Sequence, residues 1–127
     1  MTQEDKELLL VDLSARFPYN VAIDCKSEDS RFTCYLTTDM LREIQNNTCY
    51  WEYKPFLFPL SSMTEGQRKE LQELYFDYIP DEIFNDTEFV YHYDCMHLID
   101  WLNKNHFDYR GFIEKGLAID ATNKNIY

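Results

Sequence analysis

The pattern of apolar and polar residues at the start of the chain predicts an amphipathic helix. Thr2 and Asp5 have the spacing of a capping box, and Pro18 stops the run that follows. Between them, apolar side chains recur near helical spacing, at Leu9, Leu10, Leu13 and Phe17. We therefore expect a helix over residues 3–16.

Strict alternation of apolar and polar residues then predicts a β-hairpin. The two alternating runs are 21–25 and 32–36, and a polar turn separates them. Residues 39–46 fit a strand or a short helix equally well, and residues 48–53 are rich in β-forming side chains. These segments predict three or four short strands, arranged as a meander or an SH3-like partial barrel.

Helical patterns dominate the second half of the chain. Ser62 and Glu65 have capping-box spacing, and the apolar stripe that follows consists of Leu71, Leu74, Tyr75 and Tyr78. Residues 89–93 are typical of a strand, and Asp94 can cap a helix with an apolar face at Cys95, Leu98, Ile99 and Leu102.

The last predicted element is a short helix from Asp108 through Ile113, with Gly116 as its left-handed stop. Neither repeats nor a linker interrupt the chain. We expect one α+β domain over residues 1–127, with an N-terminal helix, a small antiparallel sheet and two or three C-terminal helices.

Composition excludes several classes of function. The 127 residues include 23 Asp and Glu against 12 Lys and Arg, a net charge of −11. Such a surface repels phosphate backbones, so we expect no direct binding to nucleic acid. Only three glycines are present, and none forms the glycine-rich loop of P-loop or Rossmann nucleotide sites.

The N-terminal residues and the cysteine spacing indicate a compartment. The first seven residues are polar and acidic, and no apolar run approaches the ~20 residues that span a bilayer. The four cysteines form no Cys-x-x-Cys pair. We therefore expect a cytoplasmic protein without membrane association, whose cysteines serve as small buried apolar residues.

Two stretches, residues 54–65 and 99–118, have more distinctive sequences than the periodic patterns described above. They begin Lys-Pro-Phe-Leu-Phe-Pro and Ile-Asp-Trp-Leu-Asn-Lys. Together they resemble a family of small, uncharacterised acidic proteins encoded in prophages and mobile elements of gut bacteria. The resemblance covers roughly a quarter of the chain and implies a genomic setting. It carries over no activity, cofactor or catalytic residue.

Metal-ligand and catalytic patterns are weak. The richest set of ligand-type side chains is His92, Asp94, Cys95 and His97. These residues lie on a predicted strand, at a helix cap and in a first helical turn, so their side chains point in different directions and do not converge on one metal ion. The acidic run 81–88 lacks the ligand order of an EF-hand. Neither a nucleophile elbow nor a cysteine-protease signature surrounds any Ser or Cys. We predict no metal and no cofactor, and the pattern leans against an enzyme.

A polar cluster between two predicted helices is the alternative site. It comprises His106, Asp108, Tyr109 and Arg110. Loops between rigid elements often carry binding residues, so these four could line the pocket of a small enzyme or ligand-binding domain. They equally suit a helix junction in which Asp108 caps and Arg110 pairs with acids.

The distribution of charge favours a protein interaction. Residues 70–103 hold nine acids and no Lys or Arg, while the other 93 residues sum to −2. The acids that we expect to meet a partner are Glu70, Glu73, Asp77, Asp81, Glu82, Asp86 and Glu88, with aromatic residues among them. Fixed carboxylates attract Lys and Arg, which predicts a basic host or phage protein as partner. The pattern makes no prediction of oligomeric state.

Overall fold

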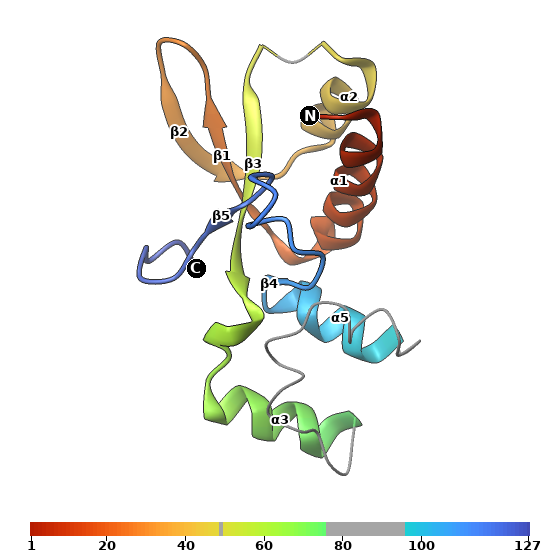
Figure 1. Ribbon diagram of the computed structural model, residues 1–127, viewed down its shortest axis with the longest axis vertical. Coiled ribbons are helices and arrows are strands. Elements are labelled where there is room, and N and C mark those ends of the chain that lie inside the picture. Colours follow the sequence, from red (N-terminus) through yellow and green to blue (C-terminus); the bar gives the residue numbers. More distant parts are fainter. Residues whose placement is uncertain (49, 76–95) are drawn as a thin grey trace.

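The computed structural model describes residues 1–48, 50–75 and 96–127, without the side chains of residues 72, 74, 75, 96 and 97 (Figure 1). The helices are α1 (Gln3–Arg16), α2 (Thr38–Asn46), α3 (Glu65–Tyr75) and α5 (Met96–Lys104), with short 3₁₀ turns η1 (Phe17–Tyr19) and η2 (Leu60–Ser62). The strands are β1 (Ala22–Lys26), β2 (Arg31–Tyr35), β3 (Glu52–Pro59), β4 (Phe107–Asp108) and β5 (Ile119–Asp120).

Helix α1 has the predicted bounds because its start is determined locally. The Thr2 hydroxyl accepts a hydrogen bond from the Asp5 N–H at 3.0 Å, and the Asp5 carboxylate accepts one from the Thr2 N–H. Leu9 and Leu13 are buried against the sheet. The prediction of a helix over residues 3–16 is confirmed.

The predicted α+β class is confirmed, but the sheet is mixed rather than antiparallel. Its order is β2-β1-β3-β4, with β5 also beside β3. The β1–β2 hairpin and the β1–β3 pair are antiparallel, as expected, whereas β4 and β5 run parallel to β3. A meander is not formed, because α2 lies between β2 and β3 in the chain and β3 returns to the far side of β1.

Strand β3 begins within the predicted 48–53 run and continues through two prolines. The Val21 carbonyl accepts from the Leu36 N–H, and the Ser27 N–H donates to the Ser30 carbonyl. The backbone N–H and C=O groups of the odd-numbered residues of β1 therefore face β2, and those of the even-numbered residues face β3. Pro55 lies opposite Ile23, so it occupies a position that needs no N–H toward β1.

The ambiguous segment 39–46 is helical. Thr37 caps α2 by accepting from the Met40 N–H at 3.3 Å, and Asn47 ends the helix in the left-handed region at φ 54°. Met40 and Ile44, four residues apart, are both buried. This burial on one helical face decides between the two alternatives that periodicity left open.

The residue that caps α3 lies two positions after the predicted one. Thr64, not Ser62, accepts from the Gln67 N–H, and the Gln67 side chain accepts from the Thr64 N–H at 2.9 Å. Ser62 lies in η2 and donates to the Pro59 carbonyl instead. The prediction at Ser62 is wrong because two capping patterns overlap in sequence, and only the backbone path after Pro59 selects one.

The last predicted helix is a series of turns over residues 112–116. Asp108 nevertheless acts much as a cap, accepting from the N–H groups of Phe112 and Ile113 at 3.0 Å each. Gly116 has the predicted left-handed conformation, at φ 73°. The predicted strand 89–93 and the cap at Asp94 lie outside the described residues.

Three buried clusters hold the described elements together. Helices α1 and α2 cover one face of the sheet through the first cluster, and the C-terminal segment covers part of the other face through Ala22, Phe56 and Ala121 (Figure 1). The third cluster joins η2, α3, α5 and β4 at the lower end of the molecule, through Leu60, Met63, Leu71, Leu98, Trp101, Leu102, Phe107 and Tyr109.

Candidate functional site

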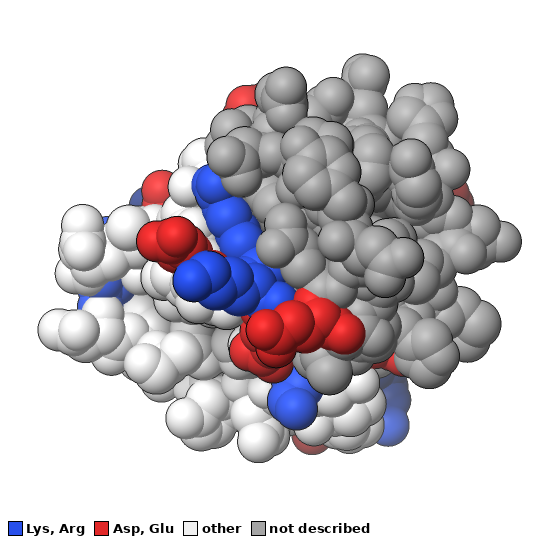
Figure 2. All heavy atoms as spheres, turned by 90° about the horizontal axis from the view of Figure 1, so that it is seen from below, with Lys and Arg blue, Asp and Glu red and all other residues white. Residues whose placement is uncertain are grey.

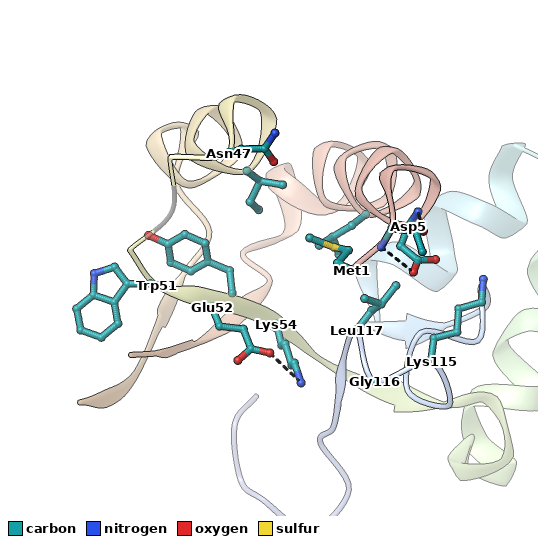
Figure 3. Close-up of a pocket in the computed structure, with 13 residues that line it drawn as sticks. Met1, Asp5, Asn47, Trp51, Glu52, Lys54, Lys115, Gly116 and Leu117 are labelled. Carbon is teal, nitrogen blue, oxygen red and sulfur yellow. Dashed lines mark hydrogen bonds and ion pairs between the residues drawn. The ribbon is translucent and has the colours of Figure 1, made fainter. Parts of the chain in front are cut away.

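A groove of about 790 Å³ lies at the upper end of the molecule, between the first turn of α1, the end of α2, the start of β3 and the turn at residues 115–117. In the view of Figure 3, Trp51 and Lys115 lie at its two ends, with Met1 and Leu117 between them. Its lining comes from three stretches that are distant in sequence, residues 1–9, 44–54 and 115–117, so neither local periodicity nor motif spacing predicted it.

The groove combines an apolar floor with a charged rim. Leu9, Ile44 and Leu117 contribute aliphatic surface. Glu52 and Lys54, successive on one side of β3, form an ion pair at 3.2 Å. The Glu52 side chain is 57% exposed and so presents a carboxylate to solvent beside Trp51.

An aromatic cluster adjoins the groove at Trp51. The rings of Phe32 and Tyr50 both meet Trp51 edge to face, with centroids 5.0 and 5.5 Å away. Tyr50 is 70% exposed and Phe32 47%. Exposed aromatic side chains in contact with one another are typical of binding surfaces, because they contribute large area at small entropic cost. We call Phe32, Tyr50 and Trp51 the aromatic cluster.

The four residues of the alternative site are brought near one another, but their polar groups face inward. Tyr109 is 1% exposed, and its hydroxyl donates to the buried Asn103 amide oxygen at 2.8 Å. Asp108 is 4% exposed and bonds the backbone of residues 110, 112 and 113. None of the four lines the groove.

A buried ion cluster lies beneath this segment. Asp12 and Arg16 of α1 are both fully buried, and Asp12 accepts from Arg16 Nε at 2.8 Å and from Arg110 Nε at 3.1 Å. Arg16 Nη2 also donates to the Phe107 carbonyl at 2.6 Å. The two guanidinium groups contact the Tyr109 ring, with Cζ atoms 5.2 and 5.1 Å from its centroid.

Sequence reasoning missed this cluster, although one signal was present. Asp12 and Arg16 have the i,i+4 spacing of a helical ion pair. Such pairs usually lie on a solvated face, and only the flanking Leu9 and Leu13 hinted at burial. Arg110 was expected to pair with nearby acids, and its acid proves to be 98 positions away in the chain.

His106 occupies a strained and largely buried position. Its backbone has φ 63°, and its ring is stacked on Tyr127. Burial, with a smaller contribution from the Arg16 charge, lowers the pKa of His106 to about 4. Its Nδ1 atom is buried without a hydrogen-bond partner among the described residues. Near neutral pH the imidazole is therefore uncharged.

Only part of the predicted acidic surface falls within the described residues. Glu70 and Glu73 are exposed on α3, and Glu70 accepts from the Trp101 indole N–H at 3.3 Å. Arg68 and Lys69 precede them, and Figure 2 shows red and blue side chains adjacent on the described part of this face. The other predicted acids, Asp77, Asp81, Glu82, Asp86 and Glu88, lie outside the described residues.

The described ranges contain no group of three or more His, Cys, Asp or Glu side chains placed to hold a metal ion. Of the weak ligand set, His92, Asp94 and Cys95 lie outside those ranges, and the His97 side chain is not described. Within the part of the chain that the structure describes, no helix combines the length and apolarity needed to cross a membrane.

Comparisons with known proteins give no relative from which a role can be transferred. No protein-family model matches the chain, and searches of curated proteins and of solved structures likewise yield no match.

Proposed function

We propose that the protein is a non-enzymatic interaction module that binds a basic protein. The observation that carries the proposal is the aromatic cluster beside the groove, in which Tyr50 and Phe32 are exposed and Trp51 is partly buried. A partner that covered Tyr50 and Trp51 would remove a contiguous aromatic surface from water, at roughly 25 cal/mol per Å² of apolar area. Residues of this kind, in contact with a pocket, are the ones that dominate binding energy at interfaces.

Charge complementarity supports a basic partner. The chain carries −11, of which −9 comes from residues 70–103. A field of this sign attracts Lys- and Arg-rich surfaces and accelerates their association at low salt. Beside the aromatic cluster, Glu52 is paired with Lys54 but keeps 57% of its side chain exposed, so it can also accept from a Lys or Arg of a partner segment next to an apolar anchor.

The groove and the acidic residues at 70–103 contribute to binding over different distances. The first turn of α1, the end of α2 and the start of β3, which line the groove, lie toward one end of the long axis, and α3 lies at the other (Figure 1). We infer that the groove supplies contact, while the acids at 70–103 contribute attraction during approach. Glu70 is held by Trp101, which keeps one of these carboxylates at a fixed position on α3.

The alternative, a small enzyme or ligand-binding domain using His106–Arg110, has less support. Asp108 and Tyr109 are buried and their polar groups bond within the chain. A ligand would have to displace these bonds before it could meet either side chain, at the cost of unpaired buried groups.

Affinity capture with matched tyrosine variants tests the proposal. The immobilised 127-residue protein is exposed to a host lysate at about 0.05 M and about 0.2 M salt, and bound proteins are identified by mass spectrometry. We expect a basic protein whose capture is weakened at least fivefold by Tyr50→Ser and by Trp51→Ala.

Tyr35→Ser is the matched control. Tyr35 is 60% exposed, similar to Tyr50, but it lies on β2 outside the aromatic cluster. Its substitution should leave capture unchanged. If Tyr35→Ser reduces capture as much as Tyr50→Ser does, or if Tyr50→Ser and Trp51→Ala leave capture unchanged, the proposal that the partner binds at the groove is wrong. If capture is lost only with Glu70→Gln and Glu73→Gln, the partner binds on α3 and not at the groove.

A further inference from the structure

Two cysteines of the hairpin lie side by side within one face of the sheet. In the β1–β2 register, Cys25 is opposite Phe32 and Cys34 is opposite Ile23, so the two cysteines are diagonal neighbours. Their Sγ atoms are 3.3 Å apart, and both residues are free thiols. A disulfide bond requires about 2.05 Å, so the two sulfur atoms must approach by about 1.25 Å and the strands must adjust slightly to give the bond its dihedral angle.

The position of Cys34 makes that approach feasible. β2 is the edge strand, with β1 as its neighbour in the sheet order. A strand held on one side can shift slightly without breaking a second ladder. Cys25, in contrast, belongs to the central strand β1 and to the buried cluster beneath α1 and α2.

The two thiols differ in their access to solvent. Cys25 is fully buried, whereas Cys34 is partly exposed. Burial raises the pKa of Cys25 to about 12, with a further contribution from the neighbouring Cys34 thiol. An oxidant arriving from solvent therefore meets Cys34 first, and Cys25 is placed as the second, resolving thiol.

We propose that Cys25 and Cys34 form an oxidation site, at which a hydroperoxide converts the two thiols to a reversible intramolecular disulfide. In the first step Cys34 Sγ attacks hydrogen peroxide, the O–O bond breaks, and a sulfenic acid and one water are formed. In the second, Cys25 Sγ attacks the Cys34 sulfur. The S–S bond forms, and the hydroxyl leaves with the Cys25 proton as a second water.

The electrons balance over the two steps. The two thiols lose two hydrogens in total, and one peroxide is reduced to two waters. A dithiol reductant reverses the change by thiol–disulfide exchange. The bond would join the edge strand to the centre of the sheet, next to Phe32, which contacts Trp51. The proposal does not depend on the proposed interaction function.

Peptide mapping of the oxidised protein tests the site. Reduced protein is treated with a stoichiometric amount of hydrogen peroxide, remaining thiols are alkylated, and the protein is digested with trypsin. Cleavage after Lys26 and Arg31 separates the two cysteines onto different peptides. We expect these peptides to be linked, with a mass loss of about 2 Da that a dithiol restores.

Single variants distinguish this pair from the other two cysteines. Cys34→Ser should abolish the crosslink, while Cys49→Ser and Cys95→Ser should retain it. Cys25→Ala should leave a sulfenic acid on Cys34 that a dimedone-type probe labels, and circular dichroism checks that this core variant is folded. A crosslink through Cys49 or Cys95 would overturn the proposal, as would oxidation of Cys34 beyond the sulfenic acid in wild-type protein without a crosslink.

Discussion

The ring of Tyr127 lies parallel to the imidazole of His106, with centroids 3.7 Å apart and an angle of 8° between the planes. The Tyr127 hydroxyl accepts from the Ala22 N–H at 2.9 Å and donates to the Phe56 carbonyl at 2.8 Å. One side chain thus bridges β1 and β3 where their direct pairing ends and also covers the lower end of β3. The C-terminal segment is an integral part of the fold.

Replacement of Tyr127 by Phe should lower the free energy of unfolding by about 1–3 kcal/mol, because the Ala22 N–H and Phe56 carbonyl lose their shared partner. Urea titration followed by circular dichroism measures the change. Tyr35→Phe, at an exposed tyrosine of β2, is the matched control and should alter stability by less than about 0.5 kcal/mol. Equal effects of the two substitutions would contradict the bridging role.

Stability should fall as pH decreases from 6.5 toward 4, in part because of His106. The pKa of this group is about 4 in the folded protein against its ordinary value of 6.5, so the unfolded chain binds the proton first. Acidification over this window therefore favours unfolding. Allowing for solvent around the partly exposed ring, we expect a contribution of about 1–2 kcal/mol.

His106→Asn isolates this contribution from the other histidines and the carboxylates. Asn tolerates the left-handed backbone at φ 63° and does not titrate. Unfolding free energies measured at several pH values should show a shallower decline for the variant between pH 6.5 and 4 than for wild type. Parallel curves for the two proteins would show that His106 does not contribute.

Loss of Asp12 should be among the most damaging single changes. Asp12→Ala removes the carboxylate that binds both Arg16 and Arg110 and leaves the buried Arg16 guanidinium uncompensated, which costs about 3–5 kcal/mol. The double variant Asp12→Leu, Arg16→Met should recover part of this loss. Thermal melting of the single and double variants measures the difference.

The exposed i,i+3 pair Asp39–Arg42 on α2 is the control for this prediction. Its side chains are 77% and 69% exposed, so Arg42→Ala should cost less than about 1 kcal/mol. A double variant less stable than Asp12→Ala alone would mean that Arg16 contributes through its packing and its hydrogen bond to the Phe107 carbonyl rather than through its pairing with Asp12.

Asp108 should stabilise the turn at residues 110–113 through its carboxylate. Asp108→Ala leaves the N–H groups of Phe112 and Ile113 without their acceptors, and we expect a loss of about 2–3 kcal/mol. Asp108→Asn keeps one acceptor oxygen and should lie between wild type and Ala. Chemical denaturation provides the comparison, and a neutral Ala variant would refute the role.

Local patterns sufficed for the elements whose limits depend on neighbouring residues. The Thr2–Asp5 box and the leucine spacing predicted α1, and alternation predicted the β1–β2 hairpin, because capping and strand periodicity act over a few positions. The left-handed Gly116 was predicted for the same reason. The same patterns did not distinguish Thr64 from Ser62 as the cap of α3.

Long-range contacts decided the rest. Residues 39–46 are helical because a helix buries both Met40 and Ile44 in the core. The sheet is mixed because β4 and β5, from a distant part of the chain, pair with β3. The burial of Asp12 depends on Arg110, 98 positions away, and the groove depends on three separate stretches. Charge and composition are readable along the chain, whereas burial and pocket shape exist only once remote segments pack together.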